Sequence, residues 1–281
     1  TEQQGGGGYI VTHNRPRLGH RTVASVRRQT MQPDELIVVD DGSHPVHIAA
    51  VRDVCDRYSA RLIEVSPSHG ANYCRNLAID ALSTTFVTGL DDDDVFLPRR
   101  IELLRASYLP QEHSFVTSRV KFVSTSRTVI SKFSGTVDPY RLEMENVVGN
   151  QIFVLKERLI DLGAFDISLS SFQDYDLWYR LLRSFGPAKV IRPVTMIIDV
   201  ASASDRVTAS PKRQLGHRQF FEKHFWSFRA PARRWHSAWL SLESGAPLFR
   251  PLCLFLCSGR TQWFSRAKRV GSHLWSRAFG R

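Results

Sequence analysis

The sequence predicts an α/β protein with a mostly parallel central sheet flanked by helices. Short apolar runs alternate with longer amphipathic segments along residues 9–108, and this alternation is typical of strand–helix–strand crossovers in a parallel sheet. The run ELIVV at residues 35–39 is apolar after its first residue, as in strands buried on both faces. Polar clusters follow three of the runs. Because ligands of such sheets bind beyond the carboxyl ends of the strands, we expect one site at that edge.

Periodicity and turn residues predict the elements of the first half of the chain. YIVT at residues 9–12 is rich in β-forming residues, and apolar positions on one face favour a helix over 17–30. Ser68 is a good helix-capping residue, so we expect a helix directly after it. In chain order, the other elements expected are strand 35–39, helix 46–58, strand 61–65 and strand 85–90.

The second half of the chain predicts strands of mixed direction. Apolar residues at helical spacing between Leu177 and Phe185 predict a helix. Asp174 lies at its start, where the helix dipole stabilises a carboxylate. The other elements expected are helix 99–108, antiparallel strands 115–124 and 128–133, strand 147–155, helix 156–162 and strand 189–200.

Charge divides the chain into unequal parts. The 281 residues carry a formal net charge of +11, and residues 201–281 hold 15 Lys and Arg against 3 Asp and Glu. Residues 1–200 hold the other 23 basic and 24 acidic side chains and are nearly neutral. We expect a flexible glycine-rich leader over 1–8, the α/β domain over 9–200 and a basic helical region over 201–281. A strongly basic region is typical of proteins that bind an anionic surface, either nucleic acid or membrane.

Composition also excludes several classes of protein. No apolar run approaches the ~20 residues of a membrane-spanning helix. The stretch TEQQGGGG lacks the charged and apolar regions of a signal peptide. The four cysteines form no C-x-x-C pattern of a metal or redox site, so a reducing cytoplasm is the expected location. An apolar and aromatic content of 42% is too high for a disordered chain.

Four consecutive aspartates, Asp91 to Asp94, follow the apolar run that ends at Leu90. Like charges at this spacing raise one another's pKa unless a cation lies among them. One interpretation is a solvated acidic loop. The aspartates nevertheless join a buried strand to the apolar segment VFLP, and burial of unpaired charge is costly. We therefore favour ligation of Mg²⁺ or Mn²⁺, which would complete its shell with water and substrate phosphates.

Two other polar sites have structural alternatives. Asp40 and Asp41 begin the sequence DDGS, which could form only a tight turn or could accept a hydrogen bond from a nucleotide base. Arg75 follows the third strand and could be a surface cation or a phosphate clamp. The residues alone do not decide between these alternatives.

Five motifs in order resemble a known family. They are THNRP at 12–16, VVDDGS at 38–43, GANYCRN at 70–76, LDDDD with a later proline at 90–98, and QDYDLWYRL at 173–181. Together they resemble glycosyltransferase family 2 over residues 9–200. The resemblance implies the GT-A fold and transfer of a sugar from a nucleotide diphosphate with inversion at the anomeric carbon. Neither a dinucleotide-type glycine fingerprint nor a P-loop lysine motif competes with it.

The resemblance implies roles for individual residues of the nucleotide site. Thr12 and Asn14 would form part of the nucleotide pocket, with Arg75 at its border. Asp40 or Asp41 would read the base, with uracil preferred.

The family pattern D-x-D-D would fall on Asp91, Asp93 and Asp94. The resemblance makes Asp93 the direct metal ligand, with Asp91 toward the ribose or the metal. Asp92 stands where the family usually has a small residue, and its side chain could point outward.

The family's catalytic pair, an acid followed by aspartate, appears here as Gln173 and Asp174. Asp174 would be the general base that takes the proton from the acceptor hydroxyl. Gln173 departs from the pattern, because glutamine can donate a hydrogen bond but cannot raise its neighbour's pKa by charge. Asp176 is the alternative base on the same helix, and Trp178 is expected in the core rather than in the acceptor site.

The basic region holds five of the six tryptophans, interleaved with arginines. Cationic amphipathic helices with Trp and Phe on one face lie in the interface of anionic bilayers. The alternative is that the aromatic residues pack on the catalytic domain. The resemblance to enzymes of bacterial lipid-linked glycans favours peripheral attachment at the inner face of the cell membrane, and we expect no nucleic acid partner. Arg206, after the last strand, would be a second phosphate contact.

The expected function is therefore an inverting, metal-dependent glycosyltransferase. Its donor would be a nucleotide-sugar, with a UDP-sugar preferred. Its acceptor would be a glycan or lipid-linked hydroxyl, as in lipopolysaccharide or surface polysaccharide assembly. Two alternatives stay open. One is a metal-dependent nucleotidyl or phosphoryl transferase that does not need Asp174, and the other is a non-enzymatic, basic nucleic-acid-binding protein.

Overall fold

The computed structural model describes residues 5–199 and 211–244. The chain forms two compact units, residues 1–216 and 217–281. The division lies within helix α8 (Pro211–His224) and therefore later than the predicted boundary at residue 200. Arg206 and the tryptophans Trp263 and Trp275 lie outside the described residues.

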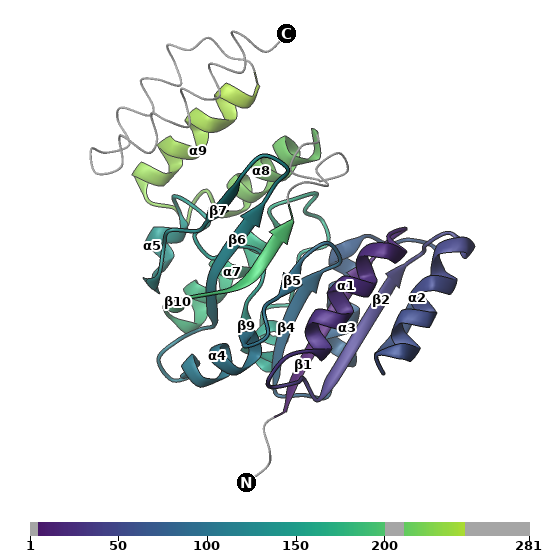
Figure 1. Cartoon of the computed structure of the whole chain (residues 1–281). Coiled ribbons are helices and arrows are strands. Elements are labelled where there is room, and N and C mark those ends of the chain that lie inside the picture. The colour runs from purple at the N-terminus through teal and green to yellow at the C-terminus, as the bar shows by residue number, and fades with distance from the viewer. Residues whose placement is uncertain (1–4, 200–210, 245–281) are drawn as a thin grey trace. The chain divides into compact units, whose positions relative to one another are not determined.

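A sheet of ten strands forms the centre of the first unit, counted over the described residues (Figure 1). The strands run in the spatial order β3-β2-β1-β4-β9-β6-β10-β5, with β7 paired to β6 and β8 paired to β10. Their bounds are β1 (Gly6–Thr12), β2 (Glu35–Asp41), β3 (Arg61–Val65), β4 (Phe86–Asp91), β5 (Val95–Phe96), β6 (Val116–Val123), β7 (Thr128–Ile130), β8 (Gly135–Val137), β9 (Phe153–Leu155) and β10 (Ala188–Asp199).

Strand direction divides the sheet into a parallel half and a mixed half. The strands β3, β2, β1 and β4 are parallel to one another, as the alternation of strands and helices predicts. In the other half β9 is antiparallel to both β4 and β6, whereas β6 and β10 are parallel. The predicted antiparallel pair of segments is confirmed by β6 and β7. The mostly parallel α/β architecture is therefore confirmed, and the short strands β5 and β8 were not predicted.

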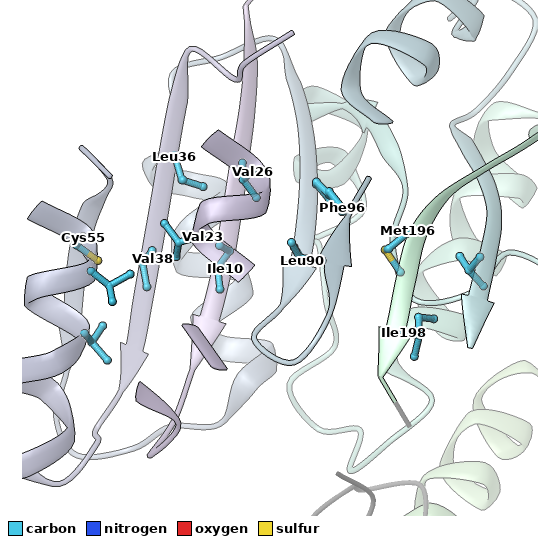
Figure 2. Packing of buried hydrophobic residues seen from close by; sticks show 13 residues of the cluster. Ile10, Val23, Val26, Leu36, Val38, Cys55, Leu90, Phe96, Met196 and Ile198 are labelled. Carbon is cyan, nitrogen blue, oxygen red and sulfur yellow. The ribbon is translucent and has the colours of Figure 1, made fainter. Parts of the chain in front are cut away.

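Helices cover both faces of this sheet. The helices of the first unit are α1 (Pro16–Arg27), α2 (Pro45–Arg57), α3 (Ala71–Ala81), α4 (Arg100–Ser107), α5 (Pro139–Leu142), α6 (Lys156–Asp161) and α7 (Gln173–Phe185). Val23 of α1 and Val54 of α2 pack against Ile10, Val38 and other strand residues in one apolar cluster (Figure 2). The helix α3 packs against β1 and β2 from the other face, where it is drawn behind the strands. Burial of this apolar surface is the main source of stability.

The glycine-rich leader is shorter than predicted. Strand β1 begins at Gly6, and its glycines pair with β2 on one side and with β4 on the other. A Cβ at Gly7 would collide with the side chains of Leu82 and Thr84. A glycine is needed at position 7 because these side chains approach the strand closely. Pairing with β2 and β4 orders the glycines despite their low strand propensity.

The predicted strand over 147–155 is also shorter, because β9 begins only at Phe153. The side-chain oxygen of Asn146 accepts hydrogen bonds from the backbone N–H groups of Val148 and Gly149, at 3.0 and 3.1 Å. Gly149 has φ of 91°, a conformation that favours glycine. This turn replaces the first half of the predicted strand and places the next two residues, Asn150 and Gln151, near the aspartates of β4.

The described part of the second unit consists of α8 from His217 onward and α9 (Ala230–Glu243). Its buried centre is aromatic and contains Phe220, Phe228 and His236. His236 also shares a 2.8 Å hydrogen bond with His217. The prediction of a basic helical region is confirmed for these residues. No helix among the described residues is both long and apolar enough to cross a membrane.

Candidate active site

Strand register brings the predicted polar clusters together. Thr12 at the end of β1 is in register with Asp40 of β2, and Val11 is in register with Asp91, the last residue of β4. These positions are at the carboxyl ends of parallel strands, where the next loop or helix leaves the sheet. The three predicted polar clusters therefore lie at one edge of the sheet, the edge where ligands of parallel sheets bind.

Asp91 is held by three side chains. Arg75 donates to Oδ1 of Asp91 through Nη2 at 3.0 Å. The amide nitrogens of Asn150 and Gln151 also donate to Asp91, at 3.0 and 3.2 Å. A Cβ at Gly89 would collide with the amide oxygen of Gln151, so the glycine in β4 permits this approach. The orientation of the first aspartate is thus fixed by contacts from α3 and from the segment before β9.

Asp92 points inward, which corrects the expectation that it could point outward. Its side chain is largely buried, Oδ2 accepts a 2.9 Å hydrogen bond from the Thr12 hydroxyl, and Oδ1 lies 3.3 Å from Arg15 Nη1. Burial raises the pKa of Asp92 to about 6, against the opposing effects of Thr12 and Arg15. Asp92 therefore belongs to the site and links the aspartates to the end of β1.

The last two aspartates have different surroundings. Oδ2 of Asp93 lies 3.3 Å from the same Arg15 nitrogen that contacts Asp92, and the carbonyl oxygen of Asp93 accepts a 2.9 Å hydrogen bond from Arg21. Asp94 is 1% exposed and accepts a 2.8 Å hydrogen bond from Asn150. Arginines therefore surround the aspartates, so that their mutual repulsion is offset within the protein.

Asp40 and Asp41 face opposite sides of the sheet, as neighbours in a strand do. The carboxylate of Asp41 accepts hydrogen bonds from the Ser68 hydroxyl at 2.9 Å and from the backbone N–H groups of His69 and Gly70 at 2.7 and 2.9 Å. Asp41 therefore stabilises the start of α3, whose N-cap residue is Gly70, through these hydrogen bonds. The predicted capping by Ser68 is wrong, because its hydroxyl donates to Asp41 instead.

Asp40 retains acceptor capacity that Asp41 lacks. One carboxylate oxygen of Asp40 accepts a 2.9 Å hydrogen bond from the backbone N–H of Ser43. The other, Oδ1, is buried and has no hydrogen-bond partner within the described part of the chain. A buried acceptor without a donor is unfavourable. Of the two predicted base-reading residues, Asp40 is therefore the one able to accept an N–H group.

Thr12 and Asn14 have structural contacts at this edge. Thr12 is buried and donates its hydroxyl to Asp92. Asn14 is exposed and has φ of 55°, and its side-chain oxygen accepts a 2.8 Å hydrogen bond from the backbone N–H of His44. Asn14 therefore joins the loops that follow β1 and β2. Both residues lie at the carboxyl-end edge of the parallel strands.

Arg75 connects the two acidic ends of the site. It is buried, bonds to Asp91, and lies 5.4 Å from the ring centroid of Phe165. Burial alone would lower the pKa of Arg75, but the negative charges of Asp91 and Asp174 more than offset this and raise it. Arg75 is therefore a fixed cation between the aspartates of β4 and the first turn of α7, not a surface residue.

The first turn of α7 presents Asp174 to this cation. Phe172, the N-cap residue, has φ of 64° in the left-handed region, which is strained by about 1–3 kcal/mol for such a residue. The chain turns at this point, and Gln173 and Asp174 begin the helix. Burial raises the pKa of Asp174 to about 7, and the charge of Asp91 adds to this effect while Arg75 opposes it. A carboxylate with such a pKa is suited to general-base catalysis near neutral pH.

Asp176 and Trp178 have structural roles on the same helix. The carboxylate of Asp176 is fully buried and forms an ion pair with Arg180, one helical turn later, at a distance of 2.8 Å. Trp178 is 2% exposed and donates to the carbonyl oxygen of Gly149 at 3.0 Å. The alternative assignment of Asp176 as the base is therefore not supported, and the placement of Trp178 in the core is confirmed.

Sequence analysis missed Arg15, Asn150 and Gln151. Arg15 lies within the motif THNRP, and a positive charge next to Asn14 at the end of a predicted strand could have indicated a partner for the aspartates. Asn150 and Gln151 are a polar pair inside an otherwise apolar segment before Phe153, and such a pair in a predicted strand was also a signal. The partner of each could not be predicted, since the contacts join residues that are far apart in sequence.

Replacement of Asn150 by alanine is expected to lower kcat/KM about tenfold, because Asp91 and Asp94 lose a shared hydrogen-bond donor. Steady-state kinetics on the folded variant would measure this. Asn150→Asp is the matched comparison, since it keeps the side-chain size but adds a third carboxylate and should lower the ratio further. Equal kcat/KM for Asn150→Ala and the wild type would contradict the assigned role of the amide.

The aspartate residues fit a divalent ion that is held mainly by its substrate. Asp91 and Asp93 offer hard carboxylate oxygens, the ligands that Mg²⁺ and Mn²⁺ prefer. No group of three His, Cys, Asp or Glu side chains forms a metal cage within residues 5–199 and 211–244. Arg15, 3.3 Å from both Asp92 and Asp93, already offsets part of their negative charge. These donors suit an ion that takes one or two carboxylates and completes its shell with phosphate oxygens and water.

Comparison with known proteins identifies the family. The family model described as "Glycosyl transferase family 2" matches residues 9–156. This chain belongs to glycosyltransferase family 2. The match covers four of the five motifs, with β1 to β4 and the aspartates among the matched residues, and it favours a glycosyltransferase over both alternative functions.

Curated relatives of this family 2 member include bacterial glycosyltransferases. The putative colanic acid biosynthesis glycosyl transferase WcaA of Escherichia coli K12 is 28% identical over 231 residues, which cover 77% of this chain and 80% of WcaA. A second relative from Escherichia coli is WfgD, named as a UDP-Glc:alpha-D-GlcNAc-diphosphoundecaprenol beta-1,3-glucosyltransferase. It is 25% identical over 166 residues, 58% of this chain and 63% of WfgD.

Solved structures agree on the fold. The mannosyltransferase PcManGT from Pyrobaculum calidifontis, in complex with GDP-Man and Mn²⁺, has a TM-score of 0.62 at 18% identity and covers 96% of this chain and 80% of its own. Residues 1–349 of S. aureus TarS in complex with UDP give a TM-score of 0.58 at 16% identity, over 94% of this chain and 91% of TarS 1–349. In another TarS structure the match covers 55% of that chain. The GT-A fold of this family 2 member is therefore confirmed.

Proposed function

We propose that this protein is an inverting, metal-dependent glycosyltransferase that moves a sugar from a UDP-sugar to a hydroxyl of a glycan or lipid-linked acceptor. One observation carries the proposal. Asp174, in the first turn of α7, lies within electrostatic range of both Arg75 and Asp91, and burial raises its pKa. This supports the proposal, because displacement at the anomeric carbon needs an acceptor base near the aspartates that face the diphosphate.

The protein's own residues divide the work of this reaction. Asp174 removes the proton from the acceptor hydroxyl as it attacks. Arg75 neutralises charge between Asp174 and the nucleotide. Asp40 accepts a hydrogen bond from an N–H group of the nucleotide base through Oδ1, which is buried without a donor among the described residues and becomes accessible when the side chain turns toward the nucleotide. Thr12 and Asn14 line the nucleotide pocket, and Arg206 would contact a phosphate. A divalent ion held by Asp93, with Asp91, would stabilise the negative charge of the departing diphosphate.

The acceptor class is proposed from the relatives. WfgD is named for a diphosphoundecaprenol acceptor and WcaA for colanic acid biosynthesis, which supports a surface polysaccharide or lipopolysaccharide product. A lipid-linked acceptor would bring the enzyme to the inner face of the cell membrane as a peripheral protein. The 15 Lys and Arg of residues 201–281 would then attract anionic lipid.

Isothermal titration of the purified chain with UDP tests the nucleotide site directly. We expect micromolar binding in the presence of Mn²⁺ and binding at least about tenfold weaker without it, because an ion held by Asp93 and Asp91 would offset the negative charge of the diphosphate. GDP serves as the matched control for base preference and should bind more weakly. Absence of binding by either nucleotide at any Mn²⁺ or Mg²⁺ concentration would contradict the proposed donor site.

A further inference from the structure

The turn between α8 and α9 exposes a tryptophan that the fold does not use. Trp226 is 88% exposed. Its indole ring meets the ring of Phe225 edge-on at 5.0 Å, and nearly all of its remaining surface faces solvent. Exposure of so large an apolar side chain is unfavourable in water. Trp226 therefore contributes little to folding, and a functional contact would explain its position.

Neighbouring aromatic residues make the contrast clear. Phe220, Phe221 and Phe228 lie on both sides of Trp226 in sequence, and all three are buried. They pack with His236 of α9, with ring centroids 5.9, 5.4 and 5.2 Å from the His236 ring. Among the described residues these three rings form one buried cluster with His236, whereas Trp226 is exposed.

Basic side chains surround the exposed indole. Lys223 and Arg229, on either side of Trp226, are both exposed. Arg233 lies 5.4 Å from the ring centroid of Phe225 and is partly exposed. Glu222 is the acidic residue of this stretch, so positive charge dominates. An indole flanked by Lys and Arg matches the headgroup region of an anionic bilayer, where the indole is buried and the cations meet phosphate.

We infer that the α8–α9 turn, residues 223–229, is the contact through which this protein binds an anionic lipid surface, with Trp226 as the inserted residue. The inference rests on the membrane partner proposed above and assigns it to a specific turn. Lys223 and Arg229 supply attraction over a distance of about one Debye length, and the indole supplies the short-range burial that keeps the turn at the interface.

Vesicle co-sedimentation of the full chain tests the inference. Vesicles of phosphatidylglycerol and phosphatidylethanolamine are compared with vesicles of phosphatidylcholine alone. Trp226→Ala is expected to lower the partition coefficient on anionic vesicles about tenfold. Val46→Ala is the matched control, because Val46 is 73% exposed but lies on α2 of the first unit, and its partition coefficient should equal that of the wild type. The melting temperature of Trp226→Ala should be unchanged, since the side chain is exposed.

The possible outcomes separate the two proposals. Equal partition of Trp226→Ala and the wild type would overturn the role of this turn and leave the membrane partner in place. Failure of the wild type to bind anionic vesicles would overturn both. If Trp226→Ala weakens binding to single-stranded RNA and not to vesicles, the occupant is nucleic acid and the inference is wrong. Binding of UDP, measured separately, decides the proposed transferase function without reference to lipid.

Discussion

Replacement of Asp174 by asparagine is expected to lower kcat for sugar transfer about 10²–10⁴-fold while UDP affinity stays near that of the wild type. Asparagine keeps the size of the side chain but cannot accept the proton of the acceptor hydroxyl. The nucleotide should still bind, because Asp40, Arg75 and the aspartates of β4 are unchanged. Transfer assays and UDP titration on the same preparation would separate the chemical step from binding.

Gln173→Glu is the matched control for this variant, since it alters the neighbouring residue without removing the base. It should retain transfer, and the added negative charge should raise the pKa of Asp174. Full activity of Asp174→Asn would contradict the assignment of the base. It would favour instead a nucleotidyl or phosphoryl transferase, which would need the aspartates of β4 but no acceptor base on α7.

The pH dependence of kcat/KM checks the same carboxylate in the free enzyme. The base must be deprotonated to act, and burial raises the pKa of Asp174 to about 7. The ratio kcat/KM should therefore fall as the pH decreases below about 7, by up to tenfold per pH unit. Gln173→Glu should move this limb to higher pH, and Asp174→Asn should abolish it. A limb near pH 4 would show that Asp174 is not desolvated in solution.

The location of the site was predictable because it follows from chain topology. Strand–helix–strand repeats require parallel strands, and the polar residues Thr12, Asp40 and Asp91 then have to meet at the carboxyl edge. The alternation of side chains along a strand also implies that Asp40 and Asp41 face opposite sides. The sequence could not predict which of the two carboxylates already accepts hydrogen bonds within the protein, because the donors to Asp41 come from the loop before α3.

Contacts between distant segments account for what the sequence analysis missed. Asp92 stands where the family usually has a small residue, and its side chain could have pointed outward, but Arg15 and Thr12 provide partners for it inside the protein. Those partners are 77 and 80 residues away along the chain, and no local pattern reports such a pairing. Contacts between distant segments also explain why the predicted flexible leader, residues 1–8, was too long. Glycines have little intrinsic strand propensity, but pairing with β4 orders Gly6 to Gly8 as part of β1.

Replacement of Asp93 by alanine is expected to remove the Mn²⁺ dependence of UDP binding and to lower kcat/KM about 10²–10³-fold. The Asp93 carboxylate lies 3.3 Å from Arg15, at the turn that follows β4. A divalent ion held there would offset the negative charge of the diphosphate, and the variant removes that ligand. Titration of each variant with UDP over a Mn²⁺ series would measure the effect.

Asp92→Asn separates ligation of the ion from the general charge of the aspartates. The variant removes one negative charge beside the same arginine, and its amide can still occupy the buried position next to Thr12. If Asp93 is the ligand, Asp92→Asn should keep the Mn²⁺ dependence and Asp93→Ala should lose it. Equal losses in both variants would mean that the ion responds to total charge and not to one ligand. Retention of full Mn²⁺ dependence by Asp93→Ala would contradict the assignment, and Asp91 would then be the residue to vary next.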